Sequence, residues 1–205
     1  MRVKRHATRG DNLRRALAQE AARIMAEHGI RDFLVAKRKA AERLGVSDGA
    51  ALLPKNSEIE EALAAYQRLF GGASHLEALH AQRSAALSAM RYLHEFEPRL
   101  VGAVLSGTAT EHSGVQLHLF ADRAESVTLK LIDQGIPHEV TERRVKLNAE
   151  RIRAFPGVRF EMNEQSIEAT VFPPEGIRQA PVSPVDGRPM RRANALEVQA
   201  LLERS

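Results

Sequence analysis

The chain has 205 residues, of which 43% are hydrophobic, so it is long enough to bury a core in one or two domains. Only 4% are aromatic and none is cysteine, which argues against aromatic platforms for single-stranded nucleic acid and excludes disulfides, cysteine zinc sites and thiol nucleophiles. The formal net charge of +4 is compatible with an anionic partner. No apolar run approaches the ~20 residues of a membrane helix, so we expect a cytoplasmic protein without a membrane partner.

Residues 1–72 are predicted to form a helical N-terminal region. Apolar residues recur at helical spacing from Asn12 to His28, and a second helical pattern covers Asp32 to Leu44. A loop rich in turn residues is expected over 45–59. A third helix then runs to about Phe70, where two glycines are expected to end it.

Residues 73–205 change from helix to strands. A helix from about His75 to Phe96 precedes a short apolar run, Leu100–Leu105, which predicts a buried strand. Alternation of apolar and polar residues predicts a half-buried strand over Val115–Phe120. The later elements are expected at 124–134 (helix), 138–145, 158–162 and 166–172 (strands) and 195–204 (helix). This order favours an α+β fold, in which a small mixed β-sheet with flanking helices follows the helical half.

The segment LSGTATEHSGVQLHLF (105–120) carries the pattern that points to chemistry. Gly107 lets the backbone approach a ligand closely because it has no Cβ, and Thr108 offers a hydroxyl and an N–H to a phosphate oxygen. Residues two apart on the following strand share one face of the sheet. Acidic residues there could hold Mg²⁺ against a triphosphate, with a third carboxylate from a neighbouring strand as base or ligand.

This layout resembles the nucleotidyltransferase superfamily, with its polymerase-beta-like fold, over roughly residues 75–172. That family has Gly-Ser at the end of its first core strand, Asp-x-Asp or Asp-x-Glu on the second, and a third carboxylate on a later strand. The resemblance aligns Gly107-Thr108 with Gly-Ser, SGVQL (113–117) with Ser-Asp-Ile-Asp-Leu, and Glu168 with the third carboxylate. The helical N-terminal portion and the SPVDGRPMRRA tail also resemble a group of proteobacterial proteins of this length.

The resemblance implies a site that binds a nucleoside triphosphate and Mg²⁺ and transfers a nucleotidyl group to an acceptor. The candidate residues are, for the nucleotide, Gly107, Thr108 and Ser113, and for catalysis, Glu168 and Gln116, with Glu111 as a loop carboxylate that could reach a metal. Gly114 and Gln116 stand where the family has two metal-binding carboxylates, and neither supplies the negative charge that Mg²⁺ requires. We therefore expect no resident metal, and a nucleotidyltransferase-like protein that is weakly active or inactive.

Three alternatives remain open. The histidines at 112, 118 and 138 could form a nitrogen-rich site for a transition metal. Basic side chains could hold a triphosphate without metal, the candidates being Lys130, Arg143, Arg144, Lys146, Arg159 and the tail run 188–192. The second functional hypothesis is a non-catalytic adaptor that binds RNA or a protein through basic helices, such as the run from Lys37 to Arg43.

Overall fold

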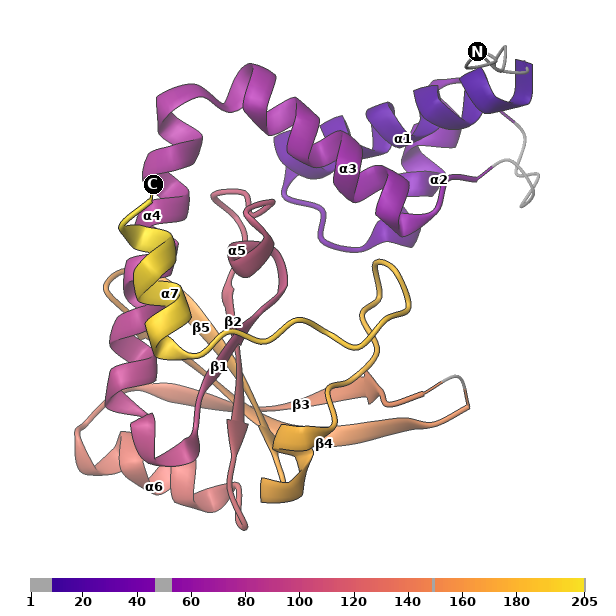
Figure 1. Ribbon diagram of the computed structural model, residues 1–205. Helices are drawn as coiled ribbons and strands as arrows, with labels where there is room; N and C mark the ends of the chain where they lie inside the picture. The colour runs from indigo at the N-terminus through magenta and orange to yellow at the C-terminus, as the bar shows by residue number, and fades with distance from the viewer. Residues whose placement is uncertain (1–8, 47–52, 149, 205) are drawn as a thin grey trace, which may run out of the picture. The chain divides into compact units, whose positions relative to one another are not determined.

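The computed structural model in Figure 1 describes residues 9–46, 53–148 and 150–204. The chain divides into two compact units, one ending at Gly72 and the other beginning at Ala73. Part of the expected 45–59 loop, residues 47–52, lies outside the described residues. The predicted α+β class is confirmed, because a helical part is followed by a small mixed sheet.

The first unit is helical and packs around small side chains. Its elements are α1 (Arg9–His28), α2 (Phe33–Arg43), α3 (Asn56–Tyr66) and a π-helical turn, η2 (Gln67–Gly71). The buried residues of α2 are all alanines, which let a neighbouring helix approach closely. Leu17, Ile24 and Ile59 are fully buried in the same cluster. Asp32 caps α2 by accepting a 2.9 Å hydrogen bond from the Val35 N–H.

The second unit contains the sheet. Its elements are α4 (Gly72–Tyr92), η3 (His94–Phe96), β1 (Arg99–Val101), α5 (Gly102–Ser106), β2 (Val115–Phe120), α6 (Glu125–Asp133), β3 (His138–Lys146), β4 (Ile152–Met162), β5 (Gln165–Phe172), η4 (Pro174–Arg178) and α7 (Ala195–Leu202). The strand order is β1-β2-β5-β4-β3. β2 and β5 are parallel, and the other neighbouring pairs are antiparallel.

The two faces of this sheet differ because side chains alternate along each strand. One face is apolar and packs with α4, α6 and α7 in the main core, where Leu117, Val158 and Ile167 are buried (Figure 1). The opposite face carries Gln116 on β2 and Glu168 on β5, and we call it the polar face. It has its own small apolar cluster at one end, formed by Phe120, Val145, Phe155 and Phe172.

A C-terminal crossover segment, residues 179–194, reaches both edge strands of the sheet (Figure 1). The Val182 N–H donates to the carbonyl of Lys146, at the end of β3, over 2.8 Å. Leu100 of β1 exchanges two backbone hydrogen bonds with Ala193, at 2.8 and 2.9 Å. The segment is therefore hydrogen-bonded to β3 and to β1, the two edge strands of the sheet.

Two strand predictions need correction. The run Leu100–Leu105 is not one strand, because β1 ends at Val101 and the chain turns at Gly102, whose φ is +73°, into α5. A short apolar run fits a buried strand and a buried helical turn equally well. β4 begins at Ile152, six residues before the predicted start, because its first half pairs along β3.

The helices also differ from the prediction at one junction. α4 begins at Gly72 rather than near His75, and it ends at Tyr92 before a short 3-10 turn. The expectation that the glycines at 71 and 72 end the third helical stretch is confirmed, because η2 ends at Gly71 and Gly72 has φ +54° and ψ −152°, outside the helical region. Within the described parts of the chain, no helix has the length and apolar character needed to span a membrane.

Candidate functional site

The parallel pairing of β2 with β5 brings three predicted positions together on the polar face. Gln116 lies directly beside Glu168 in the register of the two strands. Gly114 immediately precedes β2, and a Cβ built on it would lie 3.3 Å from Oε1 of Glu168. The positions that the resemblance aligns with the three metal carboxylates are therefore neighbours, although only Glu168 carries a carboxylate.

Gly102 is a fourth member of this cluster, and hydrophobic periodicity did not reveal it. It follows β1 directly, and its neighbour Val101 pairs with Gln116. A Cβ on Gly102 would lie 2.6 Å from Oε1 of Gln116, so only glycine fits without displacing that amide. A glycine at the end of the first core strand is the feature for which Gly107 was proposed. The expectation that LVGAVL is one strand concealed Gly102.

Gly107 and Thr108 instead complete the end of α5. Both backbone N–H groups donate to the carbonyl of Ala103, at 2.8 and 3.0 Å. Thr108 is buried, and its hydroxyl lies 2.8 Å from that of Ser106. A phosphate at this position would have to displace these local hydrogen bonds.

The loop before β2 holds two further predicted residues. Ser113 Oγ accepts a 2.9 Å hydrogen bond from the Thr110 N–H. The buried amide of Gln82, on α4, fixes the loop by donating to the carbonyls of Thr110 and Ser113 at 2.8 and 3.0 Å. Glu111 is exposed, and its carboxylate lies 3.4 Å from Nε2 of His112. The structure thus brings Gln116 and Glu168 together and leaves Glu111 on the loop surface.

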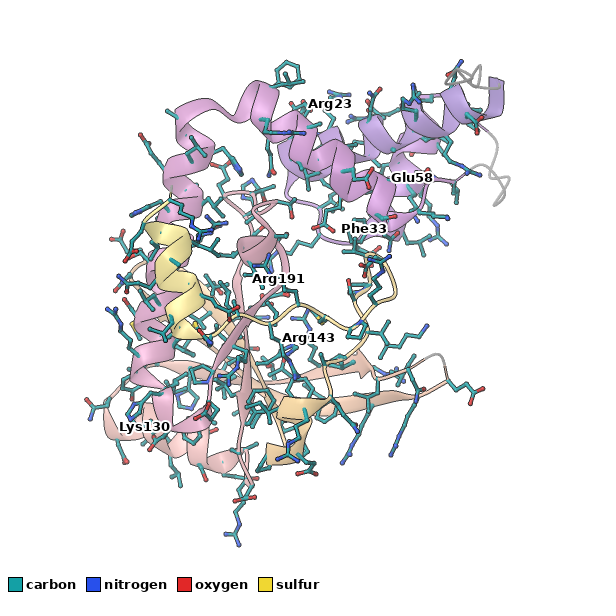
Figure 2. All side chains as sticks on the ribbon, viewed as in Figure 1. Arg23, Phe33, Glu58, Lys130, Arg143 and Arg191 are labelled. Carbon is teal, nitrogen blue, oxygen red and sulfur yellow. The ribbon has the colours of Figure 1, made fainter. Side chains whose placement is uncertain are left out.

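Glu168 faces a cation. Nη1 of Arg143, on β3, lies 3.6 Å from Oε2 of Glu168, whose side chain is only 22% exposed. Arg143 belongs to a strand two places away in the sheet order, and Figure 2 shows it over the middle of the sheet. Lys130, another basic candidate, lies apart on α6, where it pairs with Glu95 at 3.1 Å.

These groups do not fit Mg²⁺, which binds through several oxygen ligands with substantial negative charge. The cluster offers one carboxylate, one neutral amide at Gln116 and no side chain at Gly114. The guanidinium of Arg143 already offsets the single carboxylate. A magnesium ion placed there would meet a positive charge where the family pattern supplies negative ones.

His118 is buried on the polar face, although the sequence predicts a half-exposed position. Its Nδ1 accepts a 3.1 Å hydrogen bond from Nε of Arg192, so the ring proton lies on Nε2. The Arg192 guanidinium lies over the rings of Phe120 and Phe172, at 5.0 and 5.5 Å from their centroids. Burial, together with the charges of Arg192 and Arg143, lowers the pKa of His118 to about 3. His118 is therefore neutral at physiological pH.

The histidine metal site is not formed. His112 contacts Glu111, His118 contacts Arg192, and His138 Nδ1 lies 3.0 Å from the carbonyl of Ile136. In residues 9–46, 53–148 and 150–204, no three histidine, aspartate or glutamate side chains gather as metal ligands.

The basic residues of α2 are partly engaged within the first unit. Arg43 forms an ion pair with Glu20 at 3.1 Å. Lys37 is half-buried, and burial lowers its pKa. Arg38 and Lys39 are exposed. This helix therefore offers an anionic partner less charge than the sequence implies.

We expect Gly102→Ala to destabilise the sheet-bearing unit and to displace Gln116. A side chain at the left-handed φ costs about 1–2 kcal/mol, and the new Cβ meets the Gln116 amide. Gly107→Ala is the matched control, because its φ is +84° while its Cβ would meet no atom closer than 3.6 Å. Urea unfolding should show a larger loss of stability for Gly102→Ala than for Gly107→Ala. Adding Gln116→Ala to Gly102→Ala should remove this difference in stability. Equal losses for the two alanines would contradict the contact.

Comparisons of the chain with protein-family models, with curated proteins and with solved structures found no match.

Proposed function

We propose that the unit from Ala73 to Ser205 is a nucleotidyltransferase-like domain that binds a nucleoside triphosphate and transfers a nucleotidyl group weakly or not at all. The observation that carries this proposal is that Gly102, directly after β1, and Gly114, directly before β2, lie beside Gln116 of β2 and Glu168 of β5. The order of these positions matches the family pattern of a glycine, two second-strand positions and a later carboxylate.

Weak transfer follows from the charges of the cluster. In the transition state of such a transfer, a metal ion must place positive charge against the negative phosphate oxygens. Carboxylates are needed to hold that metal ion. Glu168 is the carboxylate of this cluster, and it is already paired with Arg143. Gln116 keeps the shape of an acidic residue without its charge, so it can hydrogen-bond a ligand or water but adds little to metal affinity.

A thermal-shift panel with ATP, GTP, CTP and UTP, each with and without Mg²⁺ or Mn²⁺, tests the proposal. A ligand that binds only the folded state raises the melting temperature. At a ligand concentration one hundred times its Kd, the free energy of unfolding increases by about 2.7 kcal/mol. We expect a shift with at least one nucleotide. No shift with any of the four would overturn the proposal and direct attention to the adaptor hypothesis.

Restoring the two missing carboxylates should create a metal-dependent site. Gly114→Asp with Gln116→Asp places two acidic side chains beside Glu168, and the new Cβ at 114 requires only a small shift of that carboxylate. We expect calorimetry to detect Mg²⁺ binding in the double variant. The control is Gly114→Asn with Gln116→Asn, which has the same shape without charge. If a folded aspartate variant binds Mg²⁺ no better than this control, the alignment is wrong.

A further inference from the structure

The polar face carries more positive than negative charge. Strand register and the position of the crossover segment assign five arginines and three glutamates to it among the described residues, namely Arg99, Arg143, Arg153, Arg159, Arg192, Glu139, Glu161 and Glu168. Positive potential over one sheet face attracts anions and repels divalent cations. This charge balance is the opposite of what a magnesium-dependent transferase needs at the same place.

Arg143 reaches Glu168 because Gly157 leaves a path across β4. In the register, Arg143 pairs with Phe155, and Glu168 pairs with Arg159. The line that joins Arg143 to Glu168 therefore crosses β4 at Gly157, where no side chain stands in the way. A Cβ at Gly157 would lie 2.9 Å from the Thr141 hydroxyl and 2.6 Å from a β5 carbonyl. The absence of a side chain at this position allows a β3 cation to act at the β5 carboxylate.

Resting on the proposed function above, we propose that the site takes the phosphate groups of its nucleotide without a divalent cation, and that Arg143 contacts those phosphates directly. The guanidinium presents paired N–H donors that match two phosphate oxygens. Its ion pair with Glu168 is long, at 3.6 Å, and the Arg143 side chain is 45% exposed. A phosphate can therefore compete with the carboxylate for Arg143.

Inorganic triphosphate is the probe, because it carries the phosphate chemistry without a base. Calorimetry with the full chain in EDTA should detect binding, and excess Mg²⁺ should not strengthen it. Arg143→Gln should weaken this binding on the order of tenfold, as expected for loss of a charge-assisted pair. Arg144→Gln is the matched control. Arg144 is an exposed neighbour on the opposite face of β3, and its substitution removes the same charge from the protein. Equal effects of the two variants would overturn the role of Arg143.

Glu168→Gln separates this inference from a metal site by the sign of its effect. Removing the carboxylate frees Arg143 from its competitor, so triphosphate binding in EDTA should become several-fold tighter. In a magnesium site the same change would weaken binding. A nucleotide that binds only with Mg²⁺ and is lost in Glu168→Gln would overturn the inference and leave the proposed function standing. Failure of triphosphate and of all four nucleotides, with and without metal, would overturn both.

Discussion

Lowering the pH from 6.5 towards 3 is expected to destabilise the sheet-bearing unit through His118. In the unfolded chain this imidazole takes up a proton near pH 6.5, whereas in the folded unit burial and two arginine charges lower its pKa to about 3. The unfolded state therefore binds more protons between these values, so stability is fully present above pH 6.5 and falls as the pH decreases. The shift corresponds to a loss of at most about 5 kcal/mol when the pH reaches the folded pKa.

Urea unfolding at a series of pH values measures this loss of stability. Hydrogen exchange of the backbone amides in β2 and β5 reports it for the sheet-bearing unit. His118→Gln keeps a side-chain acceptor for Arg192 but cannot titrate, so its stability should depend much less on pH between 6.5 and 4. The control is His80→Gln, at an exposed position on α4, which should retain the wild-type dependence. An unchanged pH dependence in His118→Gln would show that other groups determine the acid sensitivity.

Arg192→Met is expected to cost about 3 kcal/mol or more, because it leaves the buried His118 ring and two half-buried carbonyls without a donor. Arg192 Nη1 donates to the carbonyls of Gly176 and Ile177 at 2.8 and 3.2 Å, and Nε donates to His118. Burial lowers the pKa of Arg192 to about 10, with a smaller contribution from Arg99, so the guanidinium remains charged at neutral pH. Methionine retains contact with the two phenylalanine rings but makes none of these hydrogen bonds.

The matched control for Arg192 is its exposed neighbour, Arg191→Met. Both variants lose one positive charge from the same segment, so the difference in urea midpoint reports the buried contacts of Arg192 alone. Arg192→Lys should fall between them, because an ammonium keeps the charge but not the planar arrangement of donors. If Arg192→Met and Arg191→Met unfold at the same urea concentration, the crossover segment does not depend on this residue.

Periodicity predicted the elements that have a clear apolar stripe or alternation. Val115–Phe120 was predicted with the bounds of β2, and the predicted 166–172 strand begins one residue after β5 does. The start of β4 was missed because Ile152–Pro156 contains an arginine, an exposed isoleucine and a proline. This part is a strand because it pairs with β3 across a hairpin, and pairing with a neighbouring strand leaves little trace in a segment's own composition.

The site was predicted in part for the same physical reason. Alternation put Gln116 and Glu168 on strands that could be neighbours, and the parallel register places them side by side. His118 was expected on a half-exposed face because its cover, Arg192, is 74 residues away in the chain. The partnership of Arg143 with Glu168 depends on strand order and on the gap at Gly157, neither of which periodicity can reveal.

The position of the crossover segment in the chain determines when the edges of the sheet become covered during synthesis. It follows all five strands in the chain, yet it supplies backbone hydrogen bonds to both edge strands, at Lys146 and Leu100. During synthesis the strands therefore emerge before the segment that covers part of each edge. Uncovered edges present free N–H and C=O groups that other chains can pair with. A product that stops before Val182 would keep both edges open, and it would be the species most prone to associate with copies of itself.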